Sequence, residues 1–449
     1  MMQSKPPAAS AALASFAARA RWQDFPEPVR QATRRSLLNG LSTALGSAHD
    51  PAVDAIARTL RTFSGPEQAT LIGRRERMDA ASAAFVNAVA INLLDFDDTH
   101  MPTIIHPTAP VAPVALALAE WRGLSGLRLL ESFAIGAEIE CRIGLAVTPG
   151  HYARGWHITS TCGVFGAAAA AVKLLDIDDE RTANALGIAA SLSAGLVENL
   201  PTAAKNAGVG NAARSGLLAA LLAGNGQRAA ATALEGPLGW ARATGDEPDV
   251  TALTGDLGRR WEFARNTFKP YPAGIVMHAV IDACLALRSE HALDPGRIAS
   301  VTVTGDALLL ARGDRVVTND RDARVSIHHC AAVALLHGEA DVREFSETIV
   351  FDPVVVALRG KVRAELDPSM PVGAACVAIK LTSGRSVTHT VLNARGSLEQ
   401  PLSDADIEAK LRKHASAGAP GCDADRIIEA VWTLDRDDEG LSRLIAAIA

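Results

Sequence analysis

A long series of apolar, alanine-rich stretches with helical periodicity is the feature that most limits the folds open to this chain. The series runs from Ala8 to about Leu287, and many of its members are apolar almost all round. Helices of that kind lie inside a bundle, where other helices cover every face. Representative stretches are Ala80 to Leu94, Thr108 to Trp121, Leu127 to Leu145 and Ser160 to Leu175. The sequence therefore predicts a large bundle of closely packed helices.

The composition supports this prediction and excludes several other classes. Hydrophobic residues make up 48% of the 449 residues but aromatic residues only 4%, which favours packed helices over a β-sandwich. The length exceeds one ordinary core, so two or three domains are expected. Lys and Arg total 44 and Asp and Glu 50, a net charge of −6 without a long basic or acidic block. We therefore expect neither nucleic acid nor a membrane as a partner.

The cysteines and the N-terminal sequence indicate in which cellular compartment the protein is expected. The six cysteines are scattered without a C-x-x-C pair, which excludes a zinc ribbon and suits free thiols in a reducing cytosol. The alanine-rich start resembles a signal peptide, but Arg19 and Arg21 interrupt it, so we expect an N-terminal helix. Lys173 ends the best candidate for a membrane span before about 18 apolar residues accumulate. The sequence predicts a soluble, cytoplasmic protein.

The helical pattern changes between Phe268 and Pro272, where two prolines break any helix. The expected elements that follow are a helix from Ile275 to Glu290, a strand from Ala299 to Thr304, a helix from Ser326 to His337, a strand from Lys361 to Leu366, a hairpin of Ala374 to Leu381 with Ser386 to Leu392, and a helix capped by Ser403. We predict a mostly α fold: a large all-helical bundle domain built from both ends of the chain (1–268 and 402–449) plus an inserted smaller α+β lid domain (269–401).

The densest polar cluster in an apolar setting runs from Asn92 to His100 and is followed by His106. We expect Asp95 to point inward from the last turn of its helix, and Asp97 and Asp98 to form a solvated helix end. Burying a carboxylate costs several kcal/mol unless it is paired, so the cluster predicts an active site or a loop network. A divalent metal site is a third alternative, which no i, i+4 histidine pair supports.

Three further positions place a basic side chain where an anion could bind. His157 precedes an alanine-rich helix that Ser160 or Thr159 can cap, so it lies near a positive helix end, although a capping-loop histidine without a ligand is the alternative. Lys205 precedes a glycine-rich turn, and Lys269 lies alone in the proline-rich junction, where a merely solvated lysine is the ordinary alternative. Because no strand precedes the glycines after Lys205, a dinucleotide site is not expected.

His328 and His329 begin a helix of the smaller domain and are either a pair facing a cleft or one surface and one core histidine. Nucleophile signatures such as G-x-S-x-G are missing from the sequence. The remaining chemistry is acid and base catalysis by His, Lys and Asp on an anion.

Five ordered motifs together resemble the MmgE/PrpD family, which includes 2-methylcitrate dehydratase, cis-aconitate decarboxylase and iminodisuccinate epimerase. They are Leu94-Asp95-Phe96-Asp97-Asp98-Thr99 with His106-Pro107, Gly155-Trp156-His157-Ile158-Thr159-Ser160, Lys205 with its glycines, Phe268-Lys269-Pro270-Tyr271-Pro272, and Asp322-Ala323-Arg324-Val325-Ser326 leading into Ala332-Val333-Ala334-Leu335. The resemblance covers nearly the whole chain. It implies the same two-domain fold, usually as a homodimer, with an active site between the domains that uses no metal and no organic cofactor.

The resemblance also implies roles for particular residues. The expected catalytic residues are His106, His157, Asp95 and Lys205, and the expected substrate-binding residues are Thr99, Lys269, Tyr271 and His329. The two histidines would exchange protons and the two lysines would bind carboxylates. The chain departs from the family lyases twice: Lys205 is followed by Asn206, Ala207 and Gly208 instead of proline, leucine and histidine, and His329 stands where a tyrosine is common.

These residues predict a cofactor-independent acid/base enzyme that acts next to a carboxylate of a small di- or tricarboxylate. The main expectation is a lyase, by dehydration or decarboxylation, of the 2-methylcitrate dehydratase or cis-aconitate decarboxylase type. An epimerase or isomerase of a dicarboxylate, similar to iminodisuccinate epimerase, is the first alternative, and a non-catalytic carboxylate-binding protein is the second.

Overall fold

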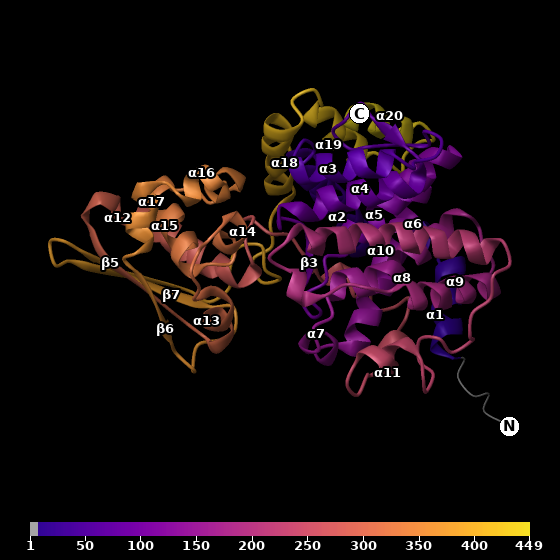
Figure 1. Cartoon of the computed structure of the whole chain (residues 1–449), viewed down its shortest axis with the longest axis horizontal. Helices are drawn as coiled ribbons and strands as arrows, with labels where there is room; N and C mark the ends of the chain where they lie inside the picture. Colours follow the sequence, from indigo (N-terminus) through magenta and orange to yellow (C-terminus); the bar gives the residue numbers. More distant parts are fainter. Residues whose placement is uncertain (1–7) are drawn as a thin grey trace. The chain divides into compact units, whose positions relative to one another are not determined.

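The computed structural model describes residues 8–449 and confirms the mostly α fold. The chain divides into two compact units (Figure 1). Residues 8–93, 97–266 and 403–449 form what we call the helical unit, and residues 94–96 and 267–402 form the sheet unit. Both ends of the described chain thus belong to the same unit.

The helical unit is a bundle around one fully buried helix. Its helices are α1 (Ala9–Arg19), α2 (Glu27–Gly46), α3 (Pro51–Arg61), α4 (Ala80–Leu93), α5 (Thr108–Arg122), α6 (Gly126–Val147), α7 (Gly150–Ala153), α8 (Ile158–Leu174), α9 (Asp179–Leu192), α10 (Ala203–Gly224), α11 (Trp240–Thr244), α18 (Asp404–Gly418), α19 (Ala424–Trp432) and α20 (Gly440–Ile448). Every residue of α8 is buried, and α5, α6, α9 and α10 pack against it.

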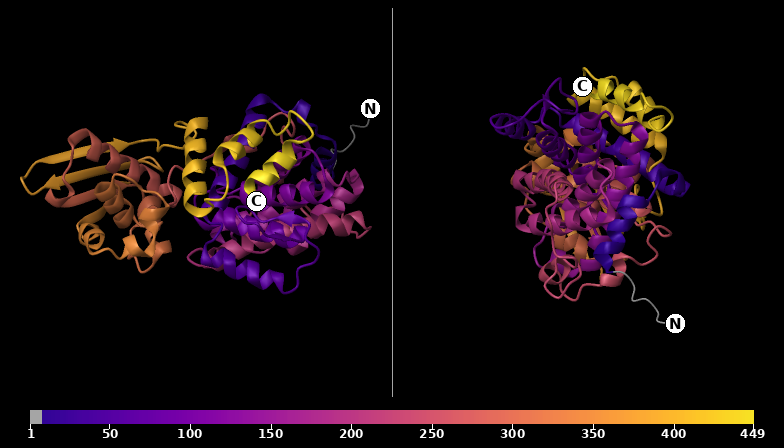
Figure 2. Two further views of the ribbon diagram at one scale, coloured as in Figure 1. Left: turned by 90° about the horizontal axis from the view of Figure 1, so that it is seen from above. Right: turned by 90° about the vertical axis from the view of Figure 1, so that its right-hand side faces the viewer.

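The alanine-rich sequence explains why α8 can lie in the centre. Ala167 to Ala171 have no exposed surface, and side chains this small let neighbouring helices approach closely. The C-terminal helices complete the bundle, since α18 packs against α2 (Figures 1 and 2). Ser403 caps α18 in a capping box with Asp406, as the sequence predicts. None of the described helices is long and apolar enough to cross a membrane.

The sheet unit combines a four-stranded mixed sheet with short helices. Its strands are β5 (Ile298–Gly305), β6 (Val362–Leu366), β7 (Ala375–Leu381) and β8 (Ser386–Val391), in the order β6-β5-β7-β8. Strand β6 runs parallel to β5, and the other neighbouring strands are antiparallel. Its helices are α12 (His278–His291), α13 (Ala307–Gly313), α14 (Asp320–Ala323), α15 (Ile327–His337), α16 (Glu347–Val350) and α17 (Pro353–Arg359). Helices α12 and α15 pack on each other and on the sheet.

The predicted hairpin is confirmed. Strands β7 and β8 pair from Ala375 with Val391 to Lys380 with Ser386, and Gly384 has a φ of 88° in the turn between them. A positive φ is easy for glycine and costly for most other residues, so this glycine helps to fix the register.

Candidate active site

The loop after α4 does not form the solvated helix end that the sequence predicts. Helix α4 ends at Leu93, and the side chains of Asp97 and Asp98 have no exposed surface. Asp95 is half-buried and has a φ of 55°, in the left-handed region, so the chain turns sharply there. The prediction for Asp97 and Asp98 was wrong because the loop turns inward, and contacts made by distant segments cover it.

Those distant contacts are clearest at Asp98. The Thr108 hydroxyl, at the start of α5, donates a hydrogen bond of 2.5 Å to Asp98 Oδ2, and the side-chain amide of Asn266 donates to the same oxygen. The pKa of Asp98 is raised to about 7, chiefly by burial and also by the neighbouring Asp97 carboxylate, while the hydrogen bonds from Thr108 and Asn266 oppose the rise. Asp98 is therefore a buried carboxyl that can hold a proton near neutral pH.

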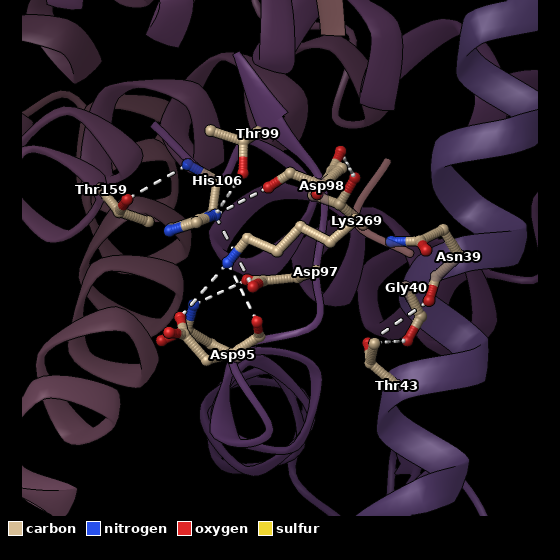
Figure 3. Close-up of polar contacts among 12 residues, drawn as sticks. Asn39, Gly40, Thr43, Asp95, Asp97, Asp98, Thr99, His106, Thr159 and Lys269 are labelled. Carbon is tan, nitrogen blue, oxygen red and sulfur yellow. Dashed lines mark hydrogen bonds and ion pairs between the residues drawn. The ribbon is translucent and has the colours of Figure 1, made fainter. Parts of the chain in front are cut away.

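His106 has its Nδ1 side fixed by the same loop (Figure 3). Nδ1 lies 2.7 Å from the backbone carbonyl oxygen of Asp98 and 3.2 Å from the hydroxyl oxygen of Thr99, in β3 (Thr99–His100). A carbonyl oxygen can only accept, so the hydrogen-bond network assigns a proton to Nδ1. In the neutral ring Nε2 is then the basic nitrogen, and it is the atom that can exchange a proton with a substrate.

A carboxylate faces the same ring nitrogen. Asp97 Oδ1 lies 3.6 Å from His106 Nδ1, and only 13% of the His106 side chain is exposed. The other oxygen of Asp97 accepts a hydrogen bond of 2.6 Å from the amide of Asn92, the penultimate residue of α4. Asn206, on α10, donates in turn to the side-chain and backbone oxygens of Asn92, at 3.0 Å each. Sequence reasoning missed Asn92 and Asn206 as site residues, although their amides stand inside the two motifs it singled out.

His157 takes the N-cap position of α8, which begins at Ile158 and not at Ser160 as expected. Its Nδ1 lies 2.7 Å from the Ser160 hydroxyl oxygen, and its side chain is almost fully buried. Its backbone N–H donates to the carbonyl of Gly195, whose φ is 142°. A Cβ at Gly195 would lie 2.6 Å from the Cβ of Ser160, so only glycine fits beside this histidine.

Lys205 lies in the first turn of α10, with 7% of its surface exposed. The glycine-rich turn predicted after it is wrong: α10 begins at Ala203 and runs on through Gly208 and Gly210. A close approach explains these glycines, because a Cβ at Gly208 would lie 2.9 Å from the Ser160 hydroxyl oxygen. Since Ser160 also contacts the ring of His157, the helix that carries Lys205 lies close to that histidine.

The sheet unit holds the other predicted lysine. Lys269 is buried, and its ammonium donates to the backbone oxygen of Asp95 at 3.0 Å and to Asp95 Oδ1 at 3.4 Å (Figure 3). Arg324 donates to the backbone oxygens of Leu94 and Pro272. These contacts attach residues 94–96 to the sheet unit. Asp95 therefore lies in the sheet unit with Lys269, whereas Asp97 lies in the helical unit with His106.

Tyr271 and His329 have partners inside the sheet unit. The Tyr271 hydroxyl donates to Asp282 at 2.6 Å, and burial raises the pKa of this phenol, so it keeps its proton. His329 is fully buried, donates from Nε2 to the backbone oxygen of Glu344 at 2.9 Å, and has a pKa lowered to about 4 by burial. His328 is partly exposed and lies 2.8 Å from Asp314. His329 is thus a core histidine and His328 a surface one. The substrate contacts expected for Tyr271 and His329 remain predictions.

One more buried carboxyl lies on α6. Glu140 has no exposed surface, and neither carboxyl oxygen has a hydrogen-bond partner among residues 8–449. Burial raises its pKa well above the ordinary value, and the charge of Asp98 adds to the effect. Burial therefore favours the protonated form of Glu140. No sequence pattern marks this residue, since an isolated glutamate in a helical stretch usually faces solvent.

The helical unit therefore contributes His106, His157, the buried Lys205 and carboxyls with raised pKa values, groups that can transfer protons to and from an anion. Fixed orientation of His106 and His157 is the property that a general acid or base requires. The sheet unit contributes a buried lysine that can bind a carboxylate through a charge-assisted hydrogen bond.

Comparison with known proteins agrees with this chemistry. The family model of the MmgE/PrpD N-terminal domain matches residues 11–253, and that of the MmgE/PrpD C-terminal domain matches residues 271–436. The chain is 29% identical over 435 residues to cis-aconitate decarboxylase of Mus musculus, covering 92% of this chain and 88% of the relative. It is 28% identical over 422 residues to the Homo sapiens cis-aconitate decarboxylase, covering 91% and 88% of the two chains, and 25% identical over 460 residues to that of Aspergillus terreus, covering 95% and 93%.

Proposed function

The chain belongs to the MmgE/PrpD family, and from this premise we propose that it is a lyase that removes carbon dioxide from a small unsaturated tricarboxylate such as cis-aconitate. The fixed orientation of His106, in a chain similar over nine-tenths of its length to proteins named cis-aconitate decarboxylase, is the observation that carries the proposal. Those names favour decarboxylation over the dehydration that the sequence also allowed.

The proposed reaction needs one proton for each carbon dioxide. The carbon–carbon bond to a carboxylate breaks, carbon dioxide leaves, and the bonding electron pair stays on the substrate carbon framework. A protonated imidazole then donates its Nε2 proton to form the new carbon–hydrogen bond, and solvent returns a proton to the enzyme. We assign this donation to His106, with His157 as the second proton-transfer group. A positioned general acid contributes about 10²- to 10⁴-fold to a rate.

Substrate binding is assigned to the buried lysines. Lys205 and Lys269 are proposed to bind the carboxylates that remain on the product, and Thr99 is proposed as a further substrate-binding residue. A charged hydrogen bond of this kind contributes about 1.5–3 kcal/mol. Asp95 keeps the ammonium of Lys269 oriented in the structure described here, at 3.4 Å.

Proton NMR in D₂O with cis-aconitate, citrate, 2-methylcitrate and an iminodisuccinate-type diacid tests the proposal. We expect cis-aconitate to give carbon dioxide and an unsaturated dicarboxylate that carries one solvent deuterium. New vinylic signals without carbon dioxide would identify a dehydratase, and α-proton exchange with loss of configuration would identify an epimerase; either result overturns decarboxylation. No change with any of the acids would leave a carboxylate-binding protein.

We also propose that the enzyme works as a homodimer and without a metal or an organic cofactor. The same assay in the presence of EDTA should give an unchanged rate, and a lost rate that zinc or magnesium restores would contradict metal independence. Light scattering coupled to gel filtration should give twice the mass of the 46.9 kDa chain, whereas a monomer would contradict the dimer.

A further inference from the structure

We propose that Asp97, held in place by Asn92 and Asn206, is a positioning residue that orients His106 and stabilises its protonated ring. The hydrogen bonds among Asp97, Asn92 and Asn206, together with the contact between Asp97 and His106, connect this histidine to the first turn of α10, which carries Lys205. The kinetic part of this inference rests on the proposed function, but the coupling between Asp97 and His106 does not.

The contacts form a continuous path within the helical unit. Asn206 donates to Asn92 at 3.0 Å, Asn92 donates to Asp97 Oδ2 at 2.6 Å, and Asp97 Oδ1 lies 3.6 Å from His106 Nδ1. Asn92, Asn206 and Asp97 have no exposed surface. Buried amides need such partners, because an unpaired polar group away from water costs about 1–3 kcal/mol in general, so each member fixes the next.

Asp97 and Asp98 contribute to His106 in different ways. Asp98 presents its backbone carbonyl to Nδ1, while its side chain is turned to Thr108 and Asn266. Asp97 instead presents a carboxylate oxygen that makes no hydrogen bond of its own within the described chain. A negative charge 3.6 Å from a ring that water hardly reaches favours the imidazolium, which is the proton-donating form.

Asn206 also links the path to Lys205, the proposed carboxylate-binding residue. It follows Lys205 directly, so the backbone of the lysine is fixed to the end of α4 through the Asn206 amide. A substitution in this path is therefore expected to disturb proton donation first, through His106, and carboxylate binding only weakly, through Lys205.

A matched pair of variants on α4 separates positioning from stability. Asn87 and Asn92 are both buried asparagines of this helix, and within residues 8–449 the side chain of Asn87 bonds to the backbone of Ile72 and Thr70, at 3.0 Å each. We expect Asn92→Ala and Asn87→Ala to lower the melting temperature alike. Asn92→Ala should also lower kcat about 10-fold or more, as the loss of one positioning interaction does, with KM within about twofold. Equal kcat losses in the two variants, or a normal kcat in Asn92→Ala, would overturn the inference.

Asp97→Asn removes the charge but keeps the shape and an acceptor for Asn92, and we expect kcat to fall about 100-fold. Long-range ¹H–¹⁵N spectra of protein labelled with ¹⁵N-histidine, assigned with His106→Gln, give a readout without turnover. At fixed pH the His106 ring-nitrogen signals should move in Asp97→Asn and stay in Asn87→Ala. If the His106 signals do not move in Asp97→Asn, the proposed coupling between Asp97 and His106 is overturned. If the signals move but the wild-type protein shows no turnover, only the proposed function is refuted.

Discussion

Asp98 and Glu140 of the helical unit and Lys269 of the sheet unit are buried ionisable groups with different kinds of partners. In the helical unit, burial raises the pKa values of Asp98 and Glu140; a hydroxyl and an amide oppose the rise at Asp98, and Glu140 has no hydrogen-bond partner among residues 8–449. In the sheet unit, the buried ammonium of Lys269 lies 3.4 Å from the carboxylate of Asp95. The first arrangement favours holding and passing protons, and the second favours binding an anion.

Burial alone does not produce this difference. Glu138 and Glu140 both lie on α6 and are both fully buried, but Glu138 contacts the guanidinium of Arg142 at 2.6 Å. Arginine keeps its charge in proteins, so Glu138 has an ionic partner where Glu140 has none. Burial raises the pKa values of both carboxyls, and at Glu138 the guanidinium of Arg142 opposes this rise.

Replacing one histidine in each unit should give the largest contrast. His106→Gln is expected to lower kcat by about 10²- to 10⁴-fold, because the proton donor is removed while the fold is kept. His328→Gln, at the partly exposed histidine of α15, should keep kcat within about twofold. Steady-state rates of carbon dioxide release check both variants, and equal losses would show that the proton-transfer role is not confined to the helical unit.

Asp98 predicts how the stability of the helical unit depends on pH. Its pKa in the folded chain is raised to about 7, so this group stabilises the fold fully below its ordinary value near 4, and the stabilisation is lost as the pH rises through 7. The change corresponds to up to about 4 kcal/mol. Asp98→Asn should remove this dependence of stability on pH. The melting temperature of the variant minus that of the wild type should therefore be larger at pH 8 than at pH 5. Parallel melting curves at both pH values would contradict the assignment.

The predictability of the fold and of the site differs for a physical reason. Helical and strand periodicity predicted the bundle and the hairpin, because both patterns are local. The burial of Asp97 and Asp98 was not predictable, since the groups that cover Asp98 come from Thr108 and from the distant Asn266. Gly208 was misread for a similar reason: glycine suggests a turn locally, but here it lets α10 approach Ser160.

Lys269→Met tests the anion-binding side of the comparison. Loss of a charged hydrogen bond to a substrate carboxylate, about 1.5–3 kcal/mol, should raise KM by about 10- to 100-fold and change kcat less. Lys361→Met is the matched control, because the Lys361 ammonium donates to the backbone oxygen of Ile298 within the sheet unit. An unchanged KM in Lys269→Met, or an equal rise in the control, would remove Lys269 from the binding set.

Glu140→Gln should have the smallest effect of all. A glutamine resembles a protonated carboxyl, which is the form that burial favours at Glu140, so the free energy of unfolding at pH 7 should change by less than about 1 kcal/mol. Glu138→Gln, two residues away, leaves the buried guanidinium of Arg142 without its carboxylate and should cost about 3–5 kcal/mol. Denaturant titration of the two variants compares them directly, and similar losses would mean that Glu140 is ionised in the folded protein.

The central claim is that a histidine of the helical unit supplies the proton that replaces carbon dioxide. Mass spectrometry of the product formed from cis-aconitate in D₂O, with wild type and His106→Gln side by side, tests it most directly. The account predicts that the wild type makes a dicarboxylate with one deuterium for each carbon dioxide released, and that the variant makes almost none. Product formed by His106→Gln at the rate of the wild type would contradict the account.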